Sequence, residues 1–272
     1  MTTEQGYLSF DPVASDYDWT RYMPLEIQEQ AARLLQEVAG VAEDRALLDA
    51  GTGTGRFSLP LAQLGVPVIG LDISGNMLSQ LRQKVRGEAT GKALPLRVAR
   101  ADLRHLPVKA GAIEAVLIVH ILHLIADWKR VLAEVRRVLA PGGTLLLAQE
   151  AGARMFPTRS FYMELAREHG LNRTRIGAQS LEEVVAYLRE QGAQVERVDG
   201  ERVQWRLRFQ VAKTLEALRR RSWSGIWSVP EEVNADLVDR AEAWARQTYG
   251  SLEAFEEADA QLIVWAVRWP QL

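Results

Sequence analysis

Residues 47–56, LLDAGTGTGR, place Gly51, Gly53 and Gly55 where an apolar run gives way to a helical pattern. Glycine adopts main-chain angles that other residues avoid and lets a ligand approach the backbone closely. Asp72 ends the next apolar run, 21 residues after Gly51, where a carboxylate can accept hydrogen bonds from two ribose hydroxyls. The two features together predict a nucleotide-binding corner; the competing interpretation is a tight turn with no ligand.

Two common phosphate-binding loops do not match these glycines. The dinucleotide fingerprint is G-x-G-x-x-G/A, but its third position is Arg56 when counted from Gly51 and Ser58 when counted from Gly53. No Gly-Lys-Ser/Thr follows, as a P-loop would require. A turn that cradles a pyrophosphate is therefore disfavoured, and with it a nicotinamide dehydrogenase.

The elements that must position this corner alternate between strands and helices. Short apolar runs predict buried strands at 46–50, 67–71, 94–99, 112–119 and 144–149. Helical patterns separate several of them, at 56–64, 76–86 and 128–139. This alternation predicts an α/β fold with a mostly parallel sheet. Elsewhere, helices are predicted at 24–39, 181–190, 213–221 and 231–247, and strands at 195–209 and 261–269.

Four segments together resemble the class I S-adenosylmethionine-dependent methyltransferases, most nearly the small-molecule branch that includes ubiquinone and menaquinone C-methyltransferases. They are LLDAGTGTG, VIGLDISGNML, ARADLRHLPVKAGAIEAVLIVHILHLIADW and RVLAPGGTLLL. The resemblance is strong over about 46–150 and weak elsewhere; Glu114 departs from the usual Asp, with an effect expected on packing only. It implies S-adenosyl-L-methionine as cofactor and a doubly wound, seven-stranded, Rossmann-like sheet whose last strand is antiparallel.

The resemblance also implies a single methyltransferase domain over 1–272. Within it we expect an N-terminal helical cap at 1–40 and a cofactor-binding core at 41–150. Lid insertions are expected at 151–180 and 210–250, and the remaining sheet elements at 181–209 and 251–272.

By the same resemblance, eleven residues are implied to bind the cofactor. Asp49 would orient the loop and the methionine ammonium, Asp72 would hold the ribose hydroxyls, and Asp102 would accept the adenine amino group. The alternative for Asp102 is that it is a solvated carboxylate in a turn, with no contact to a ligand. The full set is Asp49, Gly51, Gly53, Gly55, Asp72, Ile73, Met77, Asp102, Leu103, Val119 and His120.

Methyl transfer needs alignment in a desolvated pocket, and it needs a general base only if the nucleophile arrives protonated. His123 lies in ILHL, where the related phosphoethanolamine methyltransferases carry a histidine that acts with an N-terminal tyrosine; Tyr17 is its counterpart here. We hypothesise that Tyr17 and His123 close over the methyl group and relay a proton. His120 is a second catalytic candidate. Each histidine also has the simpler interpretation of a hydrogen-bonded core residue.

Absences narrow the acceptor. With no cysteine, the thiolate mechanism of 5-methylcytosine enzymes and cysteine metal sites are excluded, and no metal site is predicted. The strand at 112–119 leads into VHILHL, not the Asp/Asn-Pro-Pro-aromatic motif of enzymes that methylate amino groups of nucleic acids. A small-molecule or lipid-like acceptor is therefore expected, and nucleic acid is not. An RNA or protein methyltransferase, or a non-catalytic S-adenosylmethionine-binding protein, are the alternatives.

Charge is uneven along the chain. The formal net charge of its 272 residues is only −2, yet residues 201–222 hold 7 basic and 2 acidic residues, and 229–259 hold 9 acidic and 2 basic ones. The basic segment fits a lid with an arginine for an anionic acceptor, an RNA-binding patch, or a segment that pairs with the acidic one and guards a sheet edge.

Nothing in the sequence indicates a membrane protein. The longest apolar run, 115–126, has 12 residues, whereas a membrane-spanning helix needs about 20. No basic stretch followed by an apolar one opens the chain. The expected location is cytoplasmic, and the sequence leaves the oligomeric state open.

Overall fold

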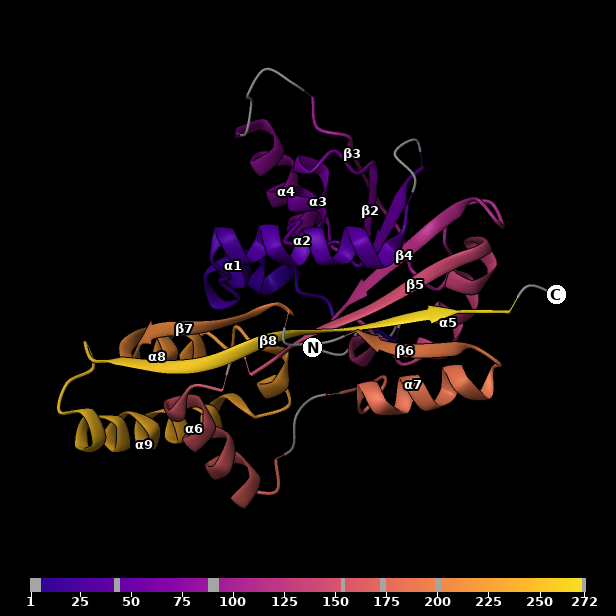
Figure 1. The fold of residues 1–272 in the computed structure, drawn as a ribbon. Coiled ribbons are helices and arrows are strands. Elements are labelled where there is room, and N and C mark those ends of the chain that lie inside the picture. Colours follow the sequence, from indigo (N-terminus) through magenta and orange to yellow (C-terminus); the bar gives the residue numbers. More distant parts are fainter. Residues whose placement is uncertain are drawn as a thin grey trace.

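The computed structural model describes residues 6–41, 45–87, 93–152, 155–171, 175–198 and 202–270. A mixed sheet forms the centre of the fold, with helices on both faces (Figure 1). Its strand order is β3-β2-β1-β4-β5-β8-β6, and β7 also pairs with β8. The strands are β1 (Leu47–Ala50), β2 (Val68–Asp72), β3 (Leu96–Arg100), β4 (Ile113–Val119), β5 (Leu139–Ala151), β6 (Gln194–Val198), β7 (Gln204–Gln210) and β8 (Phe255–Arg268).

The helices flank this sheet in two sets with separate apolar cores. On one face α2 and α3 pack through Leu35 and Leu61; on the other, α5 and α7 pack through Leu132 and Leu188. Strands covered on both faces are apolar throughout, which explains the fully buried β1. The α-helices are α1 (Tyr17–Thr20), α2 (Leu25–Ala39), α3 (Ser58–Gln63), α4 (Gly75–Gly87), α5 (Trp128–Val138), α6 (Pro157–Glu168), α7 (Leu181–Glu190), α8 (Val211–Arg219) and α9 (Glu231–Tyr249).

The predicted doubly wound α/β fold is confirmed. β1 to β5 are all parallel and lie within a few residues of the predicted strands, except that β5 is longer at both ends. Two helices differ from the prediction. The segment predicted from residue 56 becomes helical only at Ser58, two residues before Pro60, and α6 was not predicted at all.

The outer edge of the sheet corrects the prediction. Residues 195–209 were predicted as one strand, but they form two, β6 and β7, which pair with successive parts of β8. Gln261 pairs with Ala151 of β5 on one side and with Gln204 of β7 on the other, so β6 and β7 share the far edge of β8. β8 begins at Phe255, six residues before its predicted start, and the sheet has eight strands among the described residues.

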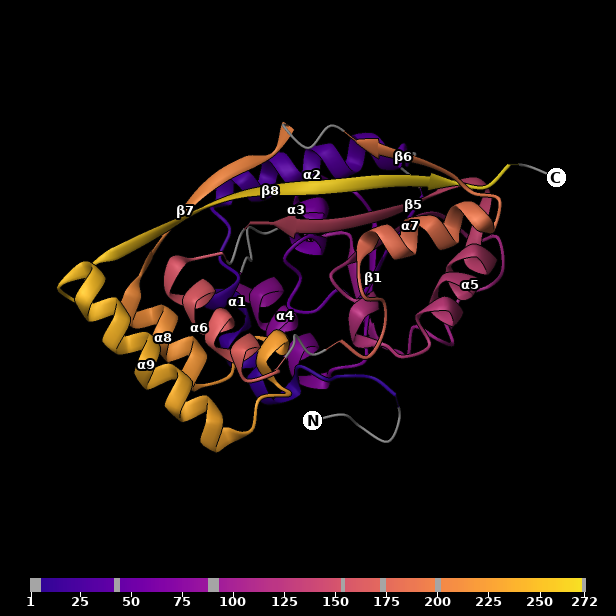
Figure 2. The ribbon, with the colours of Figure 1, turned by 90° about the horizontal axis from the view of Figure 1, so that it is seen from below.

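A third core lies beneath the β7 end of the sheet. The helices α6, α8 and α9 pack together there (Figures 1 and 2), through residues such as Leu165, Leu215 and Leu237. Glu256 of β8, only 3% exposed, accepts hydrogen bonds from the Thr158 N–H at 2.9 Å and the Thr214 hydroxyl at 2.5 Å. One buried carboxylate thus joins the sheet to both α6 and α8.

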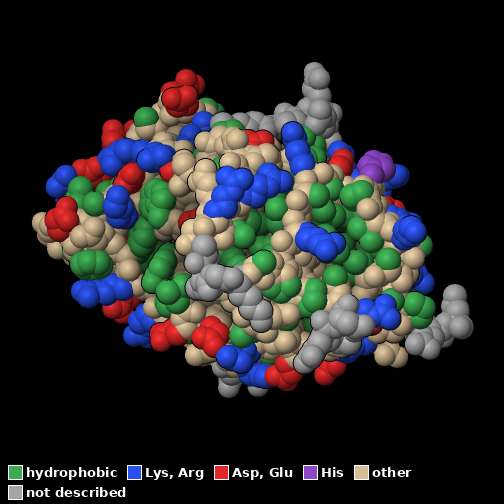
Figure 3. All heavy atoms as spheres, turned by 90° about the horizontal axis from the view of Figure 1, so that it is seen from above, with side chains coloured by type: hydrophobic (Ala, Val, Ile, Leu, Met, Phe, Trp, Pro, Cys, Tyr) green, Lys and Arg blue, Asp and Glu red, His purple; other side chains and the backbone are tan. Residues whose placement is uncertain are grey.

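The basic and acidic segments pair with each other at several points. Arg206 of β7 faces Asp259 of β8 in register, with 2.7 Å from Nε to Oδ1. Arg219 of α8 pairs with Glu242 of α9. At the left of Figure 3, over this end of the molecule, blue and red side chains are interspersed. These contacts support the interpretation in which the two segments neutralise each other.

Among the described residues, none of the helices has the length and apolar character needed to cross a bilayer.

Replacing Glu256 tests how α6 and α8 are attached. Glu256→Leu removes the acceptor of two buried donors and is expected to lower the free energy of unfolding by about 2–4 kcal/mol. The neighbouring Glu257, 51% exposed on the opposite side of β8, is the matched control, and Glu257→Leu should cost under about 1 kcal/mol. Urea denaturation measures both; equal losses would contradict this account.

Candidate active site

A cavity of about 380 Å³ lies at the carboxyl ends of β1, β2, β4 and β5. Parallel strands present these ends at one edge of the sheet, where ligands of α/β folds bind. Each strand end contributes to the lining: Gly51 follows β1, Asp72 ends β2, His120 follows β4, and Glu150 lies near the end of β5. The topology therefore gathers residues that are up to about a hundred positions apart in the chain.

The N-terminal segment forms another wall. Leu8, Phe10, Tyr17 and Arg21 all line the cavity. Two aspartates attach this segment to the nucleotide corner. The first is Asp11, which accepts hydrogen bonds from the Ser74 hydroxyl and the Asn76 N–H. Residues 8–21 therefore form part of the cavity wall, whereas α2 packs with α3 against the sheet.

Asp18 makes the second attachment. It accepts a hydrogen bond from the Thr54 hydroxyl at 2.6 Å and pairs with Lys84 at 2.7 Å. Lys84 in turn donates to the Thr54 carbonyl, so the glycine loop, α1 and α4 are held together.

The three loop glycines all have positive φ, at +95° for Gly51, +55° for Gly53 and +85° for Gly55. Gly51 and Gly53 line the cavity, whereas Gly55 faces the core. A Cβ at Gly55 would come within 2.3 Å of Leu81 Cδ1. The third glycine is thus required by packing as well as by its backbone angle.

Asp72 is placed to meet a ligand. Its two carboxylate oxygens accept the N–H groups of Gly53 at 2.9 Å and Ser74 at 2.8 Å. Burial raises the pKa of Asp72, although these N–H donors oppose the shift. Ile73 and Met77 line the same part of the cavity and supply apolar surface.

Asp49 lies beneath the glycine loop and is not among the lining residues. It accepts a hydrogen bond from the Ser58 hydroxyl, which is itself hydrogen-bonded to Thr52. Burial raises the pKa of Asp49 to about 6, against the effect of these hydroxyls. The geometry supports the predicted part of Asp49 in orienting the loop; its contact with a methionine ammonium stays a prediction.

Asp102 and Leu103 are not brought into the cavity lining. The Asp102 carboxylate accepts the Arg104 N–H at 2.9 Å and pairs with the Arg104 guanidinium at 2.7 Å. These hydrogen bonds from Arg104 lower the pKa of Asp102, and Leu103 is buried in the core. Both the adenine contact and the alternative of a solvated turn carboxylate stay predictions.

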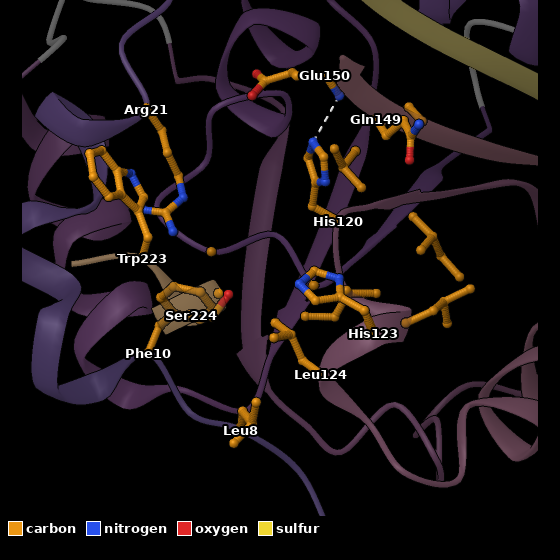
Figure 4. A pocket seen from close by; sticks show the side chains of 18 of the residues that line it. Leu8, Phe10, Arg21, His120, His123, Leu124, Gln149, Glu150, Trp223 and Ser224 are labelled. Carbon is orange, nitrogen blue, oxygen red and sulfur yellow. Dashed lines mark hydrogen bonds between the residues drawn. The ribbon is translucent and has the colours of Figure 1, made fainter. Parts of the chain in front are cut away.

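The three catalytic candidates, Tyr17, His120 and His123, line one cavity. Figure 4 shows His120 and His123 near its middle, with Phe10, Trp223 and Arg21 to one side. The Glu150 N–H donates to His120 Nε2 at 2.8 Å, so this nitrogen carries the lone pair and the neutral ring carries its proton on Nδ1. Tyr17 packs against Phe10 and lies under the Arg21 guanidinium, 4.3 Å from ring centroid to Cζ.

Sequence reasoning missed Arg56 and Glu150. Arg56 was considered only as a mismatch to the dinucleotide fingerprint, yet its side chain is 13% exposed and pairs with the almost fully buried Glu150. Burial disfavours the charge on Arg56, but Glu150 and the hydroxyl of Tyr17 outweigh it and raise the pKa. A carboxylate directly after the predicted strand at 144–149 was the signal available in the sequence.

The polar and apolar groups at this corner fit a nucleoside cofactor. Gly51 and Gly53 line the cavity without side chains, and a Cβ at these positions would approach Ile121 to 3.1 Å and Met77 to 3.2 Å. A carboxylate for two hydroxyls and an apolar wall lie next to it. Among the described residues, no group of three or more His, Asp or Glu side chains is arranged to hold a metal ion.

Comparison with known sequences agrees with this fit. Residues 48–147 match the family model described as a methyltransferase domain. The demethylmenaquinone methyltransferase of Thermus thermophilus is 33% identical over 143 residues, which cover 52% of this chain and 63% of that protein. The chain spans less than two thirds of the length of the first curated relatives that it matches.

Solved structures share the fold at low sequence identity. The YcgJ protein of Bacillus subtilis superposes with a TM-score of 0.59 at 16% identity, over 89% of this chain and 99% of that one. A phosphoethanolamine N-methyltransferase of Haemonchus contortus, solved with phosphomonomethylethanolamine and S-adenosylhomocysteine, gives a TM-score of 0.55 at 17% identity over 97% of this chain and 61% of that one.

Residues 48–147 therefore match a methyltransferase domain, in agreement with the resemblance of the sequence motifs to class I S-adenosylmethionine-dependent methyltransferases. Among proteins of this class, the chain resembles the demethylmenaquinone methyltransferases. These comparisons support S-adenosylmethionine as the cofactor, as the sequence motifs predicted.

The packing role of Gly55 can be separated from its backbone angle. Gly65 has a similar φ of +88° but open space around its Cβ position. Gly65→Ala should therefore cost only the backbone strain, about 1 kcal/mol, and Gly55→Ala a further 1–3 kcal/mol or so from overpacking against Leu81. Thermal and urea unfolding of both variants measure the difference; equal costs would show that Leu81 does not constrain the loop.

The raised pKa of Asp49 predicts a pH-dependent stability. The folded protein binds this proton more tightly than the unfolded chain, whose pKa is near 3.8. The resulting stabilisation is full below pH 4 and is lost as the pH rises through about 6. Relative to Asp49→Asn, the wild type should lose up to about 3 kcal/mol over this window.

Urea denaturation at intervals between pH 3.5 and 7.5 provides the measurement. Asp102→Asn serves as the contrast, because the pKa of Asp102 is lowered and its stabilising effect is lost as the pH falls instead. Parallel pH profiles for the wild type and Asp49→Asn would contradict the assignment.

Proposed function

We propose that this protein transfers a methyl group from S-adenosylmethionine to a small-molecule or lipid-like acceptor. One observation carries the proposal: a single cavity joins the Gly51, Gly53 and Asp72 corner to a second part lined by aromatic and apolar side chains around His120 and His123. A cofactor and a small acceptor can thus meet away from bulk water, as an in-line methyl transfer requires.

The chain's own residues would align the reactants. S-adenosylmethionine, when bound, supplies a methyl group activated by its sulfonium. In this proposal Asp72 binds the ribose hydroxyls, Gly51 and Gly53 approach the cofactor through their main chain, and Val119 and His120 form the floor near the reacting centre. Asp49 holds the loop from below.

Tyr17 and His123 are proposed to close over the methyl group and to relay a proton. They line the cavity from different elements, the N-terminal helix and the segment after β4. His120 has a different role in this proposal. Because its Nε2 accepts the Glu150 N–H, it acts as a neutral donor through Nδ1 rather than as a base through Nε2.

The nature of the acceptor is the finer part of the proposal. The bacterial relatives are named demethylmenaquinone methyltransferases, which makes demethylmenaquinone the first acceptor to test. However, several cavity residues, such as Met155, Arg159 and Trp223, lie outside the matched residues 48–147. The family match therefore does not identify the acceptor. An RNA or protein acceptor, or cofactor binding without catalysis, is an alternative outcome.

Two measurements test the function. Calorimetric titration should give binding of S-adenosylmethionine and S-adenosylhomocysteine but not of NAD. Transfer of a labelled methyl group into a cell extract, followed by separation of small molecules, lipids, RNA and protein, should place the label in the first two fractions. Label in RNA or protein overturns the acceptor class, and binding without transfer overturns catalysis.

Replacing Tyr17 and His123 tests the catalytic proposal. Tyr17→Phe and His123→Gln should each lower kcat by about 10- to 100-fold, because each loses a positioned proton donor or acceptor. Cofactor affinity should change by less than about twofold, since neither side chain belongs to the Asp72 corner. Tyr22→Phe is the matched control, as Tyr22 is 58% exposed and outside the cavity lining. Unchanged turnover in both variants would refute the roles.

A further inference from the structure

A second cavity, of about 470 Å³, lies between α6 and the segment 175–179. Met155, Arg159 and Arg175 line both cavities, so the second one adjoins the first. The residues around it are Met155, Arg159, Ser160, Met163, Arg167, Leu171, Arg175 and Gln179. Nothing in the sequence motifs or in the methyl-transfer proposal uses this space.

The ionisable side chains that line the second cavity are all arginines. They are Arg159, Arg167 and Arg175, and no carboxylate of the described residues shares the lining. Glu183, the acidic residue that bonds to this segment, accepts the Gln179 N–H at 2.6 Å and lies outside the lining. Three guanidinium groups around one small space create a strongly positive environment suited to an oxyanion.

Arg159 connects this positive environment to the first cavity. It is only 7% exposed and lies over the ring of Trp223, 4.8 Å from its centroid. Trp223 lines the first cavity, in the group with Phe10 and Arg21 (Figure 4). A molecule that contacts Trp223 in the first cavity is therefore one side chain away from the arginines of the second.

The rest of the second cavity is apolar and adaptable. Met155, Met163 and Leu171 supply its hydrophobic surface, and methionine side chains adjust readily to ligands of different shape. Met155 is 51% exposed, which is high for a residue that lines two cavities. Apolar walls next to three guanidinium groups fit a ligand that carries both a hydrocarbon part and an acidic group.

We propose that the second cavity holds an oxyanion, a phosphate or carboxylate group of the methyl acceptor, while the atom to be methylated lies beside His120 and His123. This inference rests on the proposed methyl-transfer function and specifies its substrate class: an anionic, partly apolar small molecule. It predicts that an uncharged acceptor such as demethylmenaquinone, the first acceptor to be tested, is a poorer substrate than an anionic one.

The test uses three probes with the same hydrocarbon chain: octyl phosphate, octanoate and octanol. Calorimetric titrations are run at low ionic strength on the full chain, with and without S-adenosylhomocysteine. We expect octyl phosphate or octanoate to bind at least about tenfold more tightly than octanol, and the difference to shrink at high salt. The better of the two anions identifies the acidic group. Equal binding of all three probes, or of none, overturns the proposal.

Variants locate the site. Arg159→Met should weaken binding of the anionic probe by about tenfold or more, and Arg167→Met should weaken it measurably. Arg167 is exposed, so its variant keeps the test decisive if Arg159→Met fails to fold. Arg246→Met on α9, 59% exposed and paired with Glu242, is the control and should bind like the wild type. Equal affinity in all three variants contradicts the assignment.

Two binding measurements distinguish an error in the substrate class from an error in the proposed function. Binding of S-adenosylhomocysteine is measured on the same samples and should be unchanged in every variant. If the wild type binds S-adenosylhomocysteine but not the anions, the substrate class is wrong and methyl transfer is unaffected. If it binds the anions but not S-adenosylhomocysteine, the second cavity stands and the methyltransferase proposal fails.

Discussion

The buried ion pair between Arg56 and Glu150 is the interaction around which the site is arranged. Arg56 belongs to the glycine loop after β1, and Glu150 lies near the end of β5. Two charges removed from water are costly unless they meet in good geometry, so each fixes the position of the other. The consequences extend outward, because the Glu150 N–H orients His120 and the Arg56 guanidinium contacts the hydroxyl of Tyr17.

In the proposed function, different parts of the chain build the cofactor corner and the acceptor space. The corner is built from the carboxyl ends of parallel strands within residues 48–147, the part that matches the methyltransferase domain. Much of the remaining wall comes from residues 8–21, α6, the segment 175–181 and Trp223. If the proposal holds, a common fold binds a common cofactor, and segments before and after the matched domain select the acceptor.

Local patterns were sufficient to predict much of the fold and part of the site. Runs of apolar residues located β1 to β4, and glycines followed by Asp72 located the cofactor corner, because these features depend on near neighbours in the chain. The division of 195–209 into β6 and β7 was not predicted. An alternating pattern indicates a strand, but it does not show that one segment forms two strands that pair with different parts of a longer strand such as β8. No pattern in the sequence indicates that Arg104 engages the Asp102 carboxylate, because such a pair depends on side-chain geometry.

By itself, the sequence determined the α/β class, the order of strands and helices from α2 to β5, and the chemistry available at the ends of those strands. The tertiary structure decided which of those groups meet. Arg56 and Glu150 are 94 positions apart. Arg159 lies on α6, whereas Trp223 lies after α8. Contacts of this kind arise only when parallel strands align their ends and helices close over them, because desolvation and geometry then select pairings that no local pattern encodes.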